Sequence, residues 1–374
     1  MQSSIALLHD FLLVPGGAEQ FALHVRKRFG EIDCTCGFID REAFPGEELS
    51  GLGIRTLTSP SRIQGWQGIK TMRAFQTRCR HIRDYDTVIY SGIYSPFAVR
   101  QHEHGRNIHY CHTPPRFVYD LRDYYLSTAS APQKLGLKAF VHYMRPRYEQ
   151  AIGRMDTVIA NSENVRKRLQ QFVGVSEVVV IHPPVYTDRF SWVEQGDYYL
   201  STARLEPYKR VELVVRAFMN MPDKKLVVAS GGSQLGALQR LADGHDNIRF
   251  TGWCSASKLQ DLVGRSVATI YIPIDEDWGM SPIESMAAGK PVIGVAEGGL
   301  RESVIEGETG ILIDVSQEHV SGSAGVPPAI HKIVSAVEFL DKARALRMRS
   351  ACIARAALFS DKVFDQKFED LLRA

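Results

Sequence analysis

The sequence lacks any long apolar run, since no stretch approaches the roughly 20 consecutive apolar residues that a membrane-spanning helix needs. This absence argues against an integral membrane protein. Residues 1–20 lack the basic start of a secretory signal peptide and reach Asp10 early, so we interpret them as containing a first strand. An excess of one charge is also missing, because the net charge is +3 over 374 residues. The 44% of hydrophobic residues excludes disorder as the main character, and the length predicts two domains.

Cysteine is scarce, and its spacing indicates no site. The six cysteines form no C-x-x-C pair and no cysteine–histidine zinc spacing, so we interpret them as buried thiols of a reduced protein. The G-x-G-x-x-G fingerprint of dinucleotide-binding helices is absent too, which disfavours an NAD-dependent enzyme. Two D-x-D pairs occur, Asp84 with Asp86 and Asp275 with Asp277. This spacing is common by chance, and we assign neither pair to a metal.

Positive charge is concentrated in the first half of the chain. Residues 1–188 hold 23 Lys and Arg against 18 Asp and Glu, whereas residues 189–374 hold 22 against 24. Basic side chains cluster within 70–83 and again within 134–154, where apolar and aromatic residues lie between them. The second cluster has the composition of a basic amphipathic segment that rests on an anionic membrane, and a solvated helix face is the alternative. No nucleic-acid-binding motif accompanies the charge, so we expect no nucleic-acid partner.

Short apolar runs rich in β-branched residues alternate with amphipathic stretches along most of the chain. The predicted strands are residues 5–8, 87–90, 107–111, 157–160, 177–181, 198–202, 225–230, 247–250, 267–272 and 291–295. The predicted helices between them include residues 18–29, 163–172, 211–219 and 255–263. Continuous apolar strands separated by helices are typical of parallel sheets covered on both faces. The sequence therefore predicts an α/β fold built from repeated strand–helix units.

A domain boundary is predicted near residues 183–196, where two prolines end a strand and a polar stretch precedes the next one. We predict one domain over 1–186 and a second over 187–356. Residues 357–374 form an amphipathic helix that we expect to pack back toward the N-terminal domain. Residues 316–328 are predicted to form a loop.

The stretch 274–291 follows a predicted strand, and ligands of open parallel sheets bind outside the carboxyl ends of their strands. We expect Ser281 to cap a helix that Gly289 ends. Gly279 lets the backbone come close to a ligand. Free N–H groups at the start of this helix, together with the helix dipole, make an anion site.

Two glutamates bracket this anion site. Glu276 precedes it and Glu284 follows, with seven residues between them. A simpler alternative treats Ser281 and Glu284 as a capping box and Glu276 as an ordinary loop carboxylate.

Two further loops after predicted strands suit phosphate groups. Residues 201–210 include Arg204 and Lys209, two fixed cations that suit a diphosphate, although a cationic surface loop is the alternative. Gly16 and Gly17 open a helix and can bring backbone N–H groups to a phosphate, but this signal is weak by itself.

His112 and Trp253 also follow predicted strands. His112 lies in Tyr-Cys-His-Thr-Pro-Pro-Arg over residues 110–116, and a lone histidine is more often structural than catalytic. Trp253 ends the tripeptide Thr-Gly-Trp over residues 251–253.

The order and spacing of these motifs over residues 5–315 resemble the retaining GT-B glycosyltransferases of family four. Glu276 and Glu284 match the E-x7-E signature of that family, in which the first glutamate contacts the donor hexose and the second contacts the nucleotide ribose. The usual sequence after the first glutamate is Gly-Phe-Gly, whereas residues 277–279 here are Asp-Trp-Gly. This variant is most similar to bacterial O-antigen and exopolysaccharide mannosyltransferases with Glu-Asp-Phe-Gly at this point.

The resemblance implies a GT-B fold, in which two Rossmann-like domains face each other across a cleft. The first would take the acceptor and the second the nucleotide sugar. The implied catalytic residues are Glu276, His112, Arg204 and Lys209. The implied donor-binding residues are Gly16, Gly17, Arg204, Lys209, Glu276, Trp278, Gly279, Met280, Ser281, Glu284 and Trp253. Neither a metal ion nor a cofactor is implied.

The implied activity is transfer of a hexose with retention, best matched by mannose from GDP-mannose. The acceptor is expected to be a glycan or a polyprenyl-diphosphate-linked glycan, in the synthesis of lipopolysaccharide or exopolysaccharide. We expect a cytoplasmic protein with peripheral contact to the inner face of the plasma membrane. The alternatives are a UDP-hexose donor, a sugar phosphorylase or epimerase with the same fold, and a non-catalytic partner subunit.

Overall fold

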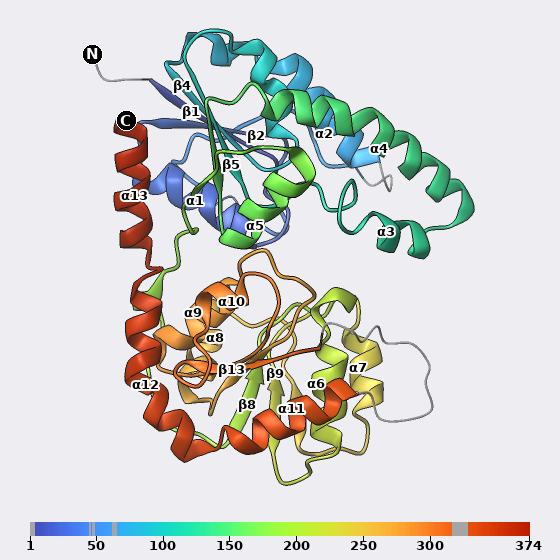
Figure 1. Cartoon of the computed structure of the whole chain (residues 1–374), viewed down its shortest axis with the longest axis vertical. Helices are drawn as coiled ribbons and strands as arrows, with labels where there is room; N and C mark the ends of the chain where they lie inside the picture. The colour runs from blue at the N-terminus through green and yellow to red at the C-terminus, as the bar shows by residue number, and fades with distance from the viewer. Residues whose placement is uncertain (1–3, 45, 47–48, 62–65, 316–327) are drawn as a thin grey trace. The chain divides into compact units, whose positions relative to one another are not determined.

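The protein is described from a computed structural model that covers residues 4–44, 46, 49–61, 66–315 and 328–374. It forms two compact units, Met1–Pro183 and Pro184–Ala374, shown in Figure 1. The predicted loop at 316–328 lies outside the described residues except for Pro328, which begins a helix.

The first unit is built around a seven-stranded sheet in the order β3-β2-β1-β4-β5-β6-β7. Every neighbouring pair in this sheet runs parallel. Its strands are β1 (Ile5–His9), β2 (Ile32–Cys36), β3 (Arg55–Thr56), β4 (Thr87–Ser91), β5 (Arg106–Cys111), β6 (Thr157–Ala160) and β7 (Val179–Val180). Strand β4 is buried along its whole length, as expected for a central parallel strand covered on both faces.

Five α-helices are described in the first unit. They are α1 (Gly17–Arg28), α2 (Trp66–Arg78), α3 (Arg122–Thr128), α4 (Ala131–Ile152) and α5 (Glu163–Arg168). Helix α4 packs its C-terminal part on the core through Val141, Met144 and Tyr148, whereas residues 131–136 are exposed. Figure 1 shows the start of α4 and the adjacent α3 extending beyond the sheet of this unit. Within the described ranges, no helix of either unit combines the length and apolar character needed to cross a bilayer.

The second unit is built around a six-stranded parallel sheet in the order β10-β9-β8-β11-β12-β13. Its strands are β8 (Tyr198–Ser201), β9 (Lys225–Val228), β10 (Ile248–Phe250), β11 (Thr269–Tyr271), β12 (Val292–Val295) and β13 (Gly310–Ile313). Its helices are α6 (Val211–Met219), α7 (Leu235–Leu241), α8 (Ala256–Arg265), α9 (Met280–Ala287), α10 (Leu300–Ser303), α11 (Pro328–Phe339), α12 (Lys342–Ala357) and α13 (Asp361–Arg373). The predicted C-terminal amphipathic helix is α13, and its packing toward the N-terminal domain stays a prediction.

The predicted α/β class with two parallel-sheet, Rossmann-like domains is confirmed. Each of the ten predicted strands overlaps an observed one. Strands β2, β3 and β13 were not predicted from the sequence. All six cysteines are unpaired, and five of them are buried.

Candidate active site

The strand order of the second sheet reverses between its two central strands, β8 and β11, and such a switch point is where open parallel sheets bind ligands. The loops that leave these two strands hold Lys209 and Glu276, and the structure brings the two side chains together. Lys209 Nζ lies 2.6 Å from Glu276 Oε2 and 3.2 Å from the hydroxyl oxygen of Tyr271. The side chain of Lys209 is 8% exposed and that of Glu276 is 18% exposed. A buried ion pair therefore stands at the edge of the sheet where a ligand is expected.

The surroundings of Lys209 keep its ammonium group charged. Burial alone would lower the pKa of Lys209, but the nearby Glu276 carboxylate and the Tyr271 hydroxyl outweigh it and raise that pKa. Burial and the charge of Glu276 raise the pKa of Tyr271, so its hydroxyl stays neutral. Tyr271 belongs to β11, and sequence reasoning treated it only as part of a strand.

Helix α9 begins earlier than predicted. The prediction of Ser281 as the N-terminal cap was wrong, because the helix starts at Met280 with Gly279 as the cap residue. Gly279 has a φ of +84°, a left-handed conformation that costs glycine little and lets the chain turn directly into the helix. Glu284 then lies in the second turn, so the capping-box alternative is excluded. The first backbone N–H groups of α9, from Met280 and Ser281, remain candidates for an anion.

Glu284 has a carboxyl group without a partner. That group makes no hydrogen bond or ion pair to any described residue, and burial raises the pKa of Glu284 to about 7. The Glu284 side chain is half-buried, and a carboxylate that is partly removed from water without donors is unfavourable. The site therefore presents an acceptor that hydroxyl groups of a ligand can satisfy.

A glycine-rich turn after β12 supports the Glu276 loop. The backbone N–H of Gly299 donates to the carbonyl of Glu276 at 2.8 Å. A Cβ at Gly298 would lie 2.3 Å from that same carbonyl oxygen, so only glycine fits the contact. The preceding Glu297 accepts from the backbone N–H of Asp275 at 3.1 Å. Residues 297–299 were missed, although a Gly-Gly pair directly after a predicted strand was a signal that could have found them.

A second glycine turn, after β9, supports the loop of Arg204. The backbone N–H of Leu205 donates to the carbonyl of Gly231 at 2.9 Å. Glu206 accepts from both the hydroxyl group and the backbone N–H of Ser233. The side chain of Arg204 is exposed and makes no hydrogen bond or ion pair to the described residues. Its guanidinium group is therefore available to a ligand.

The two predicted tryptophans have different surroundings. Trp253 follows β10 and is 67% exposed, and a Cβ at Gly231 would lie 2.4 Å from its indole nitrogen. Its ring thus stands against the second glycine turn with one surface open. The side chain of Trp278 is 2% exposed and packs edge-on against Phe359, with ring centroids 4.9 Å apart. The ring of Trp278, predicted to bind the donor, therefore belongs to the hydrophobic core of this unit.

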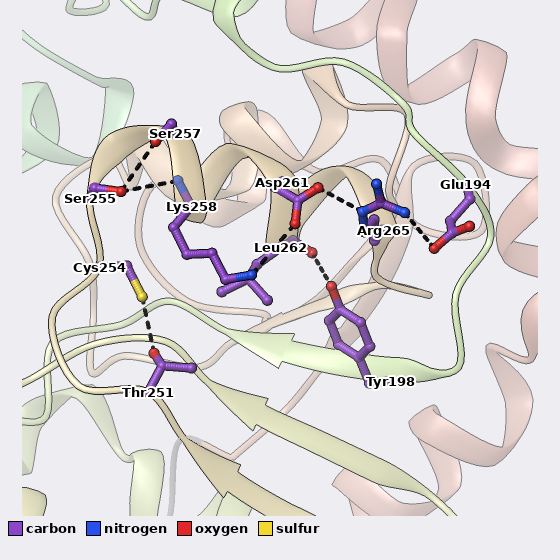
Figure 2. A network of polar contacts seen from close by, with 10 residues as sticks. All are labelled: Glu194, Tyr198, Thr251, Cys254, Ser255, Ser257, Lys258, Asp261, Leu262 and Arg265. Atoms are coloured by element: carbon purple, nitrogen blue, oxygen red, sulfur yellow. Dashed lines mark hydrogen bonds and ion pairs between the residues drawn. The ribbon is translucent and has the colours of Figure 1, made fainter.

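Helix α8 is held in place by a network of polar contacts, which Figure 2 shows. Arg265 pairs with Asp261 at 2.6 Å and with Glu194 at 2.8 Å. The hydroxyl of Tyr198 donates to the carbonyl of Leu262 at 2.7 Å. These contacts fix the helix that follows the Trp253 loop. In the described part of the chain, no three His, Cys, Asp or Glu side chains gather as a metal site would require.

The first unit has, by itself, a chain of hydrogen bonds at the carboxyl ends of β1, β4 and β5. Ser91 Oγ lies 2.9 Å from His9 Nδ1 and 2.9 Å from His112 Nε2. These three strands are adjacent in the sheet, which explains why residues far apart in sequence meet. Burial lowers the pKa of His9 to about 4. Burial, reinforced by His9 and His109, also lowers the pKa of His112, so both imidazoles are neutral at pH 7.

The hydroxyl group of Ser91 forms a hydrogen bond with each of the two neutral imidazoles. The hydroxyl donates to one ring and accepts from the other, so it couples the tautomer of His112 to that of His9. His112 is thereby held as a neutral, oriented group. Sequence reasoning singled out His112 but not His9 or Ser91.

Replacing Ser91 by alanine is expected to release His112 from a single tautomer and to lower the free energy of unfolding by about 2 kcal/mol, because two hydrogen bonds are lost. Long-range nitrogen–proton NMR of labelled histidine would show one tautomer in the native protein and an average of two in Ser91→Ala. An unchanged ring-nitrogen spectrum would contradict the role of Ser91.

The predicted glycine loop forms the start of α1. Gly17 is the first helical residue, and Gly16 is the cap residue, which has no side chain of its own to accept from the first N–H groups. A Cβ at Gly16 would lie 2.8 Å from the Glu19 carboxylate. The neighbouring Asp10 accepts from the backbone N–H groups of residues 93–95 at 2.6 to 2.8 Å. Asp10 thus ties the loop after β1 to the loop after β4, and it was missed as a structural residue.

Comparison with known proteins finds glycosyltransferase family models that match both parts of the chain. The model described as Glycosyltransferase Family 4 matches residues 15–189, and the model described as Glycosyl transferases group 1 matches residues 187–323. The D-inositol 3-phosphate glycosyltransferase of Mycobacterium sp. (strain JLS) is 29% identical over 191 residues, which cover 44% of this chain and 43% of that protein. A protein described as D-inositol 3-phosphate glycosyltransferase 2, from Catenulispora acidiphila, is 26% identical over 258 residues. These residues cover 60% of this chain and 59% of that protein. The matched parts thus span less than two thirds of these relatives.

Solved structures show a similar fold over the whole chain. Anabaena HepE in complex with UDP and glucose has a TM-score of 0.74 and 15% identity, with 100% of both chains covered. Sucrose-phosphate synthase from Thermosynechococcus elongatus has a TM-score of 0.75 and 18% identity, with 100% of this chain and 98% of that chain covered. Both likenesses support the predicted GT-B fold.

Proposed function

The chain belongs to the family-four-like GT-B glycosyltransferases, and from that premise we propose that it transfers a hexose from a nucleotide sugar to a glycan or lipid-linked glycan acceptor. The observation that carries the proposal is the buried Lys209–Glu276 pair at the switch point of the second sheet. It combines a fixed cation for a phosphate with a carboxylate for sugar hydroxyl groups, at the edge where the fold binds ligands.

The leaving group of this reaction is a nucleoside diphosphate. Negative charge grows on it as the glycosyl–phosphate bond breaks. Lys209 and the first N–H groups of α9 are preorganised to stabilise that charge, and the exposed Arg204 can join them on binding, which is why we propose a reaction without a bound metal ion. Chelation by EDTA is therefore expected to leave turnover unchanged.

Transfer with retention is proposed to occur on one face of the sugar. The acceptor oxygen bonds to the anomeric carbon while the bond to the phosphate breaks, and the acceptor proton passes to the departing phosphate oxygen. Glu276 orients the hexose through its hydroxyl groups, and Glu284 accepts from the ribose hydroxyls. Neutral His112 positions the sugar and is not required as a base.

GDP-mannose is the proposed donor, supported by the resemblance of residues 276–279, Glu-Asp-Trp-Gly, to mannosyltransferases with Glu-Asp-Phe-Gly. A UDP-hexose is the second candidate, because the similar Anabaena structure holds UDP and glucose. The contacts assigned to the ribose and diphosphate suit either donor. The base would lie near Trp253, whose exposed ring offers an aromatic surface for stacking.

A thermal-shift panel without metal tests the proposal and separates the donors. GDP, UDP, ADP and dTDP are compared with their sugar nucleotides, because binding to the folded state raises the melting temperature. A selective shift with GDP and GDP-mannose is expected. A selective UDP shift would keep the enzyme class and replace the donor. No shift with any of them would overturn the transferase proposal in favour of a non-catalytic subunit.

We further propose that the first unit contacts an anionic membrane, where a lipid-linked acceptor would lie. Around the start of α4, Leu135 is 73% exposed, and Tyr124 and Tyr125 of α3 are 39% and 42% exposed. The side chains of Lys134 and Lys138 beside them are exposed and make no hydrogen bond or ion pair to described residues. Exposed tyrosine and leucine side chains with unpaired lysines suit the headgroup region of an anionic bilayer.

Neutralising Lys134 and Lys138 together as glutamines is expected to weaken binding to vesicles with about 30% phosphatidylglycerol by about 30-fold, since each lysine near an anionic surface contributes about 1 kcal/mol. Co-sedimentation with such vesicles, and with pure phosphatidylcholine, measures the effect. The matched control replaces the exposed Lys342 and Arg347 of α12 in the same way. An equal loss from both pairs, or no binding by the native protein, would contradict the assigned surface.

A further inference from the structure

One carboxylate contacts both loops of the candidate site. Glu297 Oε1 lies 3.0 Å from a guanidinium nitrogen of Arg210, and its Oε2 accepts from the backbone N–H of Asp275 at 3.1 Å. The side chain of Glu297 is 13% exposed and that of Arg210 is 6% exposed. Glu297 therefore uses both oxygens on two different loops in a largely water-excluded position.

The two residues that Glu297 holds are unusual in their backbone. In the described ranges, Arg210 with φ +54° and Asp275 with φ +41° are the non-glycine residues that have a positive φ. Residues other than glycine rarely adopt a positive φ, and this backbone conformation persists only where the surrounding structure imposes it. Both residues with a strained backbone thus form a hydrogen bond to the carboxylate of Glu297.

The neighbours of these strained residues explain what the arrangement does. Arg210 directly follows Lys209, and Asp275 directly precedes Glu276. A backbone hydrogen bond from Ile274 to Tyr208, of 2.8 Å, joins the same two loops. Glu297 accordingly fixes the residue next to each partner of the Lys209–Glu276 pair.

We propose that Glu297 is a positioning residue, which sets the spacing and direction of Lys209 and Glu276 without touching the substrate. The proposal rests on the proposed function for the role of that pair. It extends the site to a carboxylate that neither the sequence motifs nor the pair itself identified. A displacement of reacting groups by about 1 Å lowers rates by about 10²-fold, so a residue of this kind has a large effect at a distance.

Two variants test the role of Glu297. Glu297→Gln keeps an oxygen for the Asp275 N–H but loses the ion pair with Arg210, and we expect kcat to fall about 10-fold. Glu297→Ala loses both contacts, and we expect a fall of about 100-fold. The Kd of the nucleoside diphosphate is expected to change less than about threefold in both, because the exposed Arg204 and the start of α9 remain in place.

The matched control is Glu212→Gln. Glu212 also pairs with an arginine, Arg216, at 2.8 Å, but the pair lies along α6 and contacts neither loop. Activity, diphosphate binding and melting temperature of this variant are expected to match those of the native protein.

Hydrogen–deuterium exchange supplies a readout that needs no turnover. We expect exchange of residues 272–279 to rise at least tenfold in Glu297→Ala while residues 292–295 of β12 stay protected. If the native protein shows no transfer but this local change appears, the proposed function fails and the positioning role survives. Native-like exchange, a kcat within twofold of the native value in Glu297→Ala, or faster exchange across the whole sheet would each overturn the positioning role.

Discussion

Replacing Lys209 by methionine is expected to lower kcat by about 10²–10³-fold, the effect of removing one preorganised charge from a developing anion. Methionine keeps most of the length of the side chain but removes the ammonium group that lies 2.6 Å from Glu276. The variant also leaves the Glu276 carboxylate without this partner, so the hexose-orienting group loses its anchor. Single-turnover measurement of donor consumption, with saturating acceptor, reports the chemical step directly.

The control for Lys209 is Lys225→Met. Lys225 also pairs with a carboxylate, Asp197, but at the opposite end of the sheet, where β9 begins, and its side chain is 62% exposed. An exposed ion pair of this kind contributes little to stability, and kcat of the variant is expected to stay within about twofold of the native value. Equal losses in the two variants, or a Lys209→Met enzyme within threefold of native activity, would remove Lys209 from the mechanism.

Replacing Glu284 by glutamine is expected to change stability and donor binding in opposite directions. At pH 8 the native carboxyl group is ionised although burial raises the pKa of Glu284 to about 7 from its ordinary 4.5. That difference in pKa lowers the free energy of unfolding of the native protein by as much as about 3 kcal/mol when Glu284 ionises. The uncharged glutamine avoids this loss, so the variant is expected to melt higher. Binding of the sugar nucleotide is expected to weaken by about 10- to 100-fold, because charge-assisted hydrogen bonds to the ribose are lost.

The effect of Glu284 on stability depends on pH. A carboxyl group whose pKa is raised in the folded protein favours the folded state below pH 4.5, and this contribution is lost as the pH rises through about 7. The stability advantage of Glu284→Gln is therefore expected at pH 8 and absent below pH 4.5. Donor affinity of the native protein is expected to fall as the pH drops through about 7, and that of the variant to stay flat. Melting curves at pH 4 and 8 check the stability, and titration calorimetry at pH 6 and 8 checks the donor affinity. A variant with native donor affinity at pH 8 would contradict the ribose contact.

The sequence predicted the central strands well because parallel strands buried on both faces are continuous apolar runs. The missed β2 carries Asp33 and Thr35 between its apolar residues, so its pattern did not stand out. The missed β3 has only two residues, Arg55 and Thr56, both exposed, and only backbone pairing with β2 defines it. Such an edge strand has no side-chain signature.

The candidate site could be predicted where its functional residues lie close together within one short segment of the sequence. Glu276, Glu284 and Gly279 lie within a single loop and helix, and so do Arg204 and Lys209 within another loop. The Ser281 cap was predicted wrongly because a serine before a proline is a common helix start, whereas the left-handed turn at Gly279 starts the helix sooner.

Residues whose role depends on strand order could not be found from the sequence. His9 and Ser91 join His112 only because β1, β4 and β5 are neighbours in the sheet. Glu297 reaches Arg210 only because β12 lies beside β11, which in turn lies beside β8. Each contact depends on the pairing of strands that are distant in sequence, and no local sequence pattern indicates which strands pair.

The two units are each formed from one continuous segment of chain, and this has a consequence for how the protein is made. A ribosome adding about 5–20 residues per second needs roughly 10 to 40 s for the second segment. Small two-state domains rich in non-local strand pairing fold in milliseconds to seconds, which is shorter than this time. The seven-stranded unit can therefore complete its sheet while the second unit is still being translated, so its strands are already paired before a second set of parallel strands emerges to compete for them.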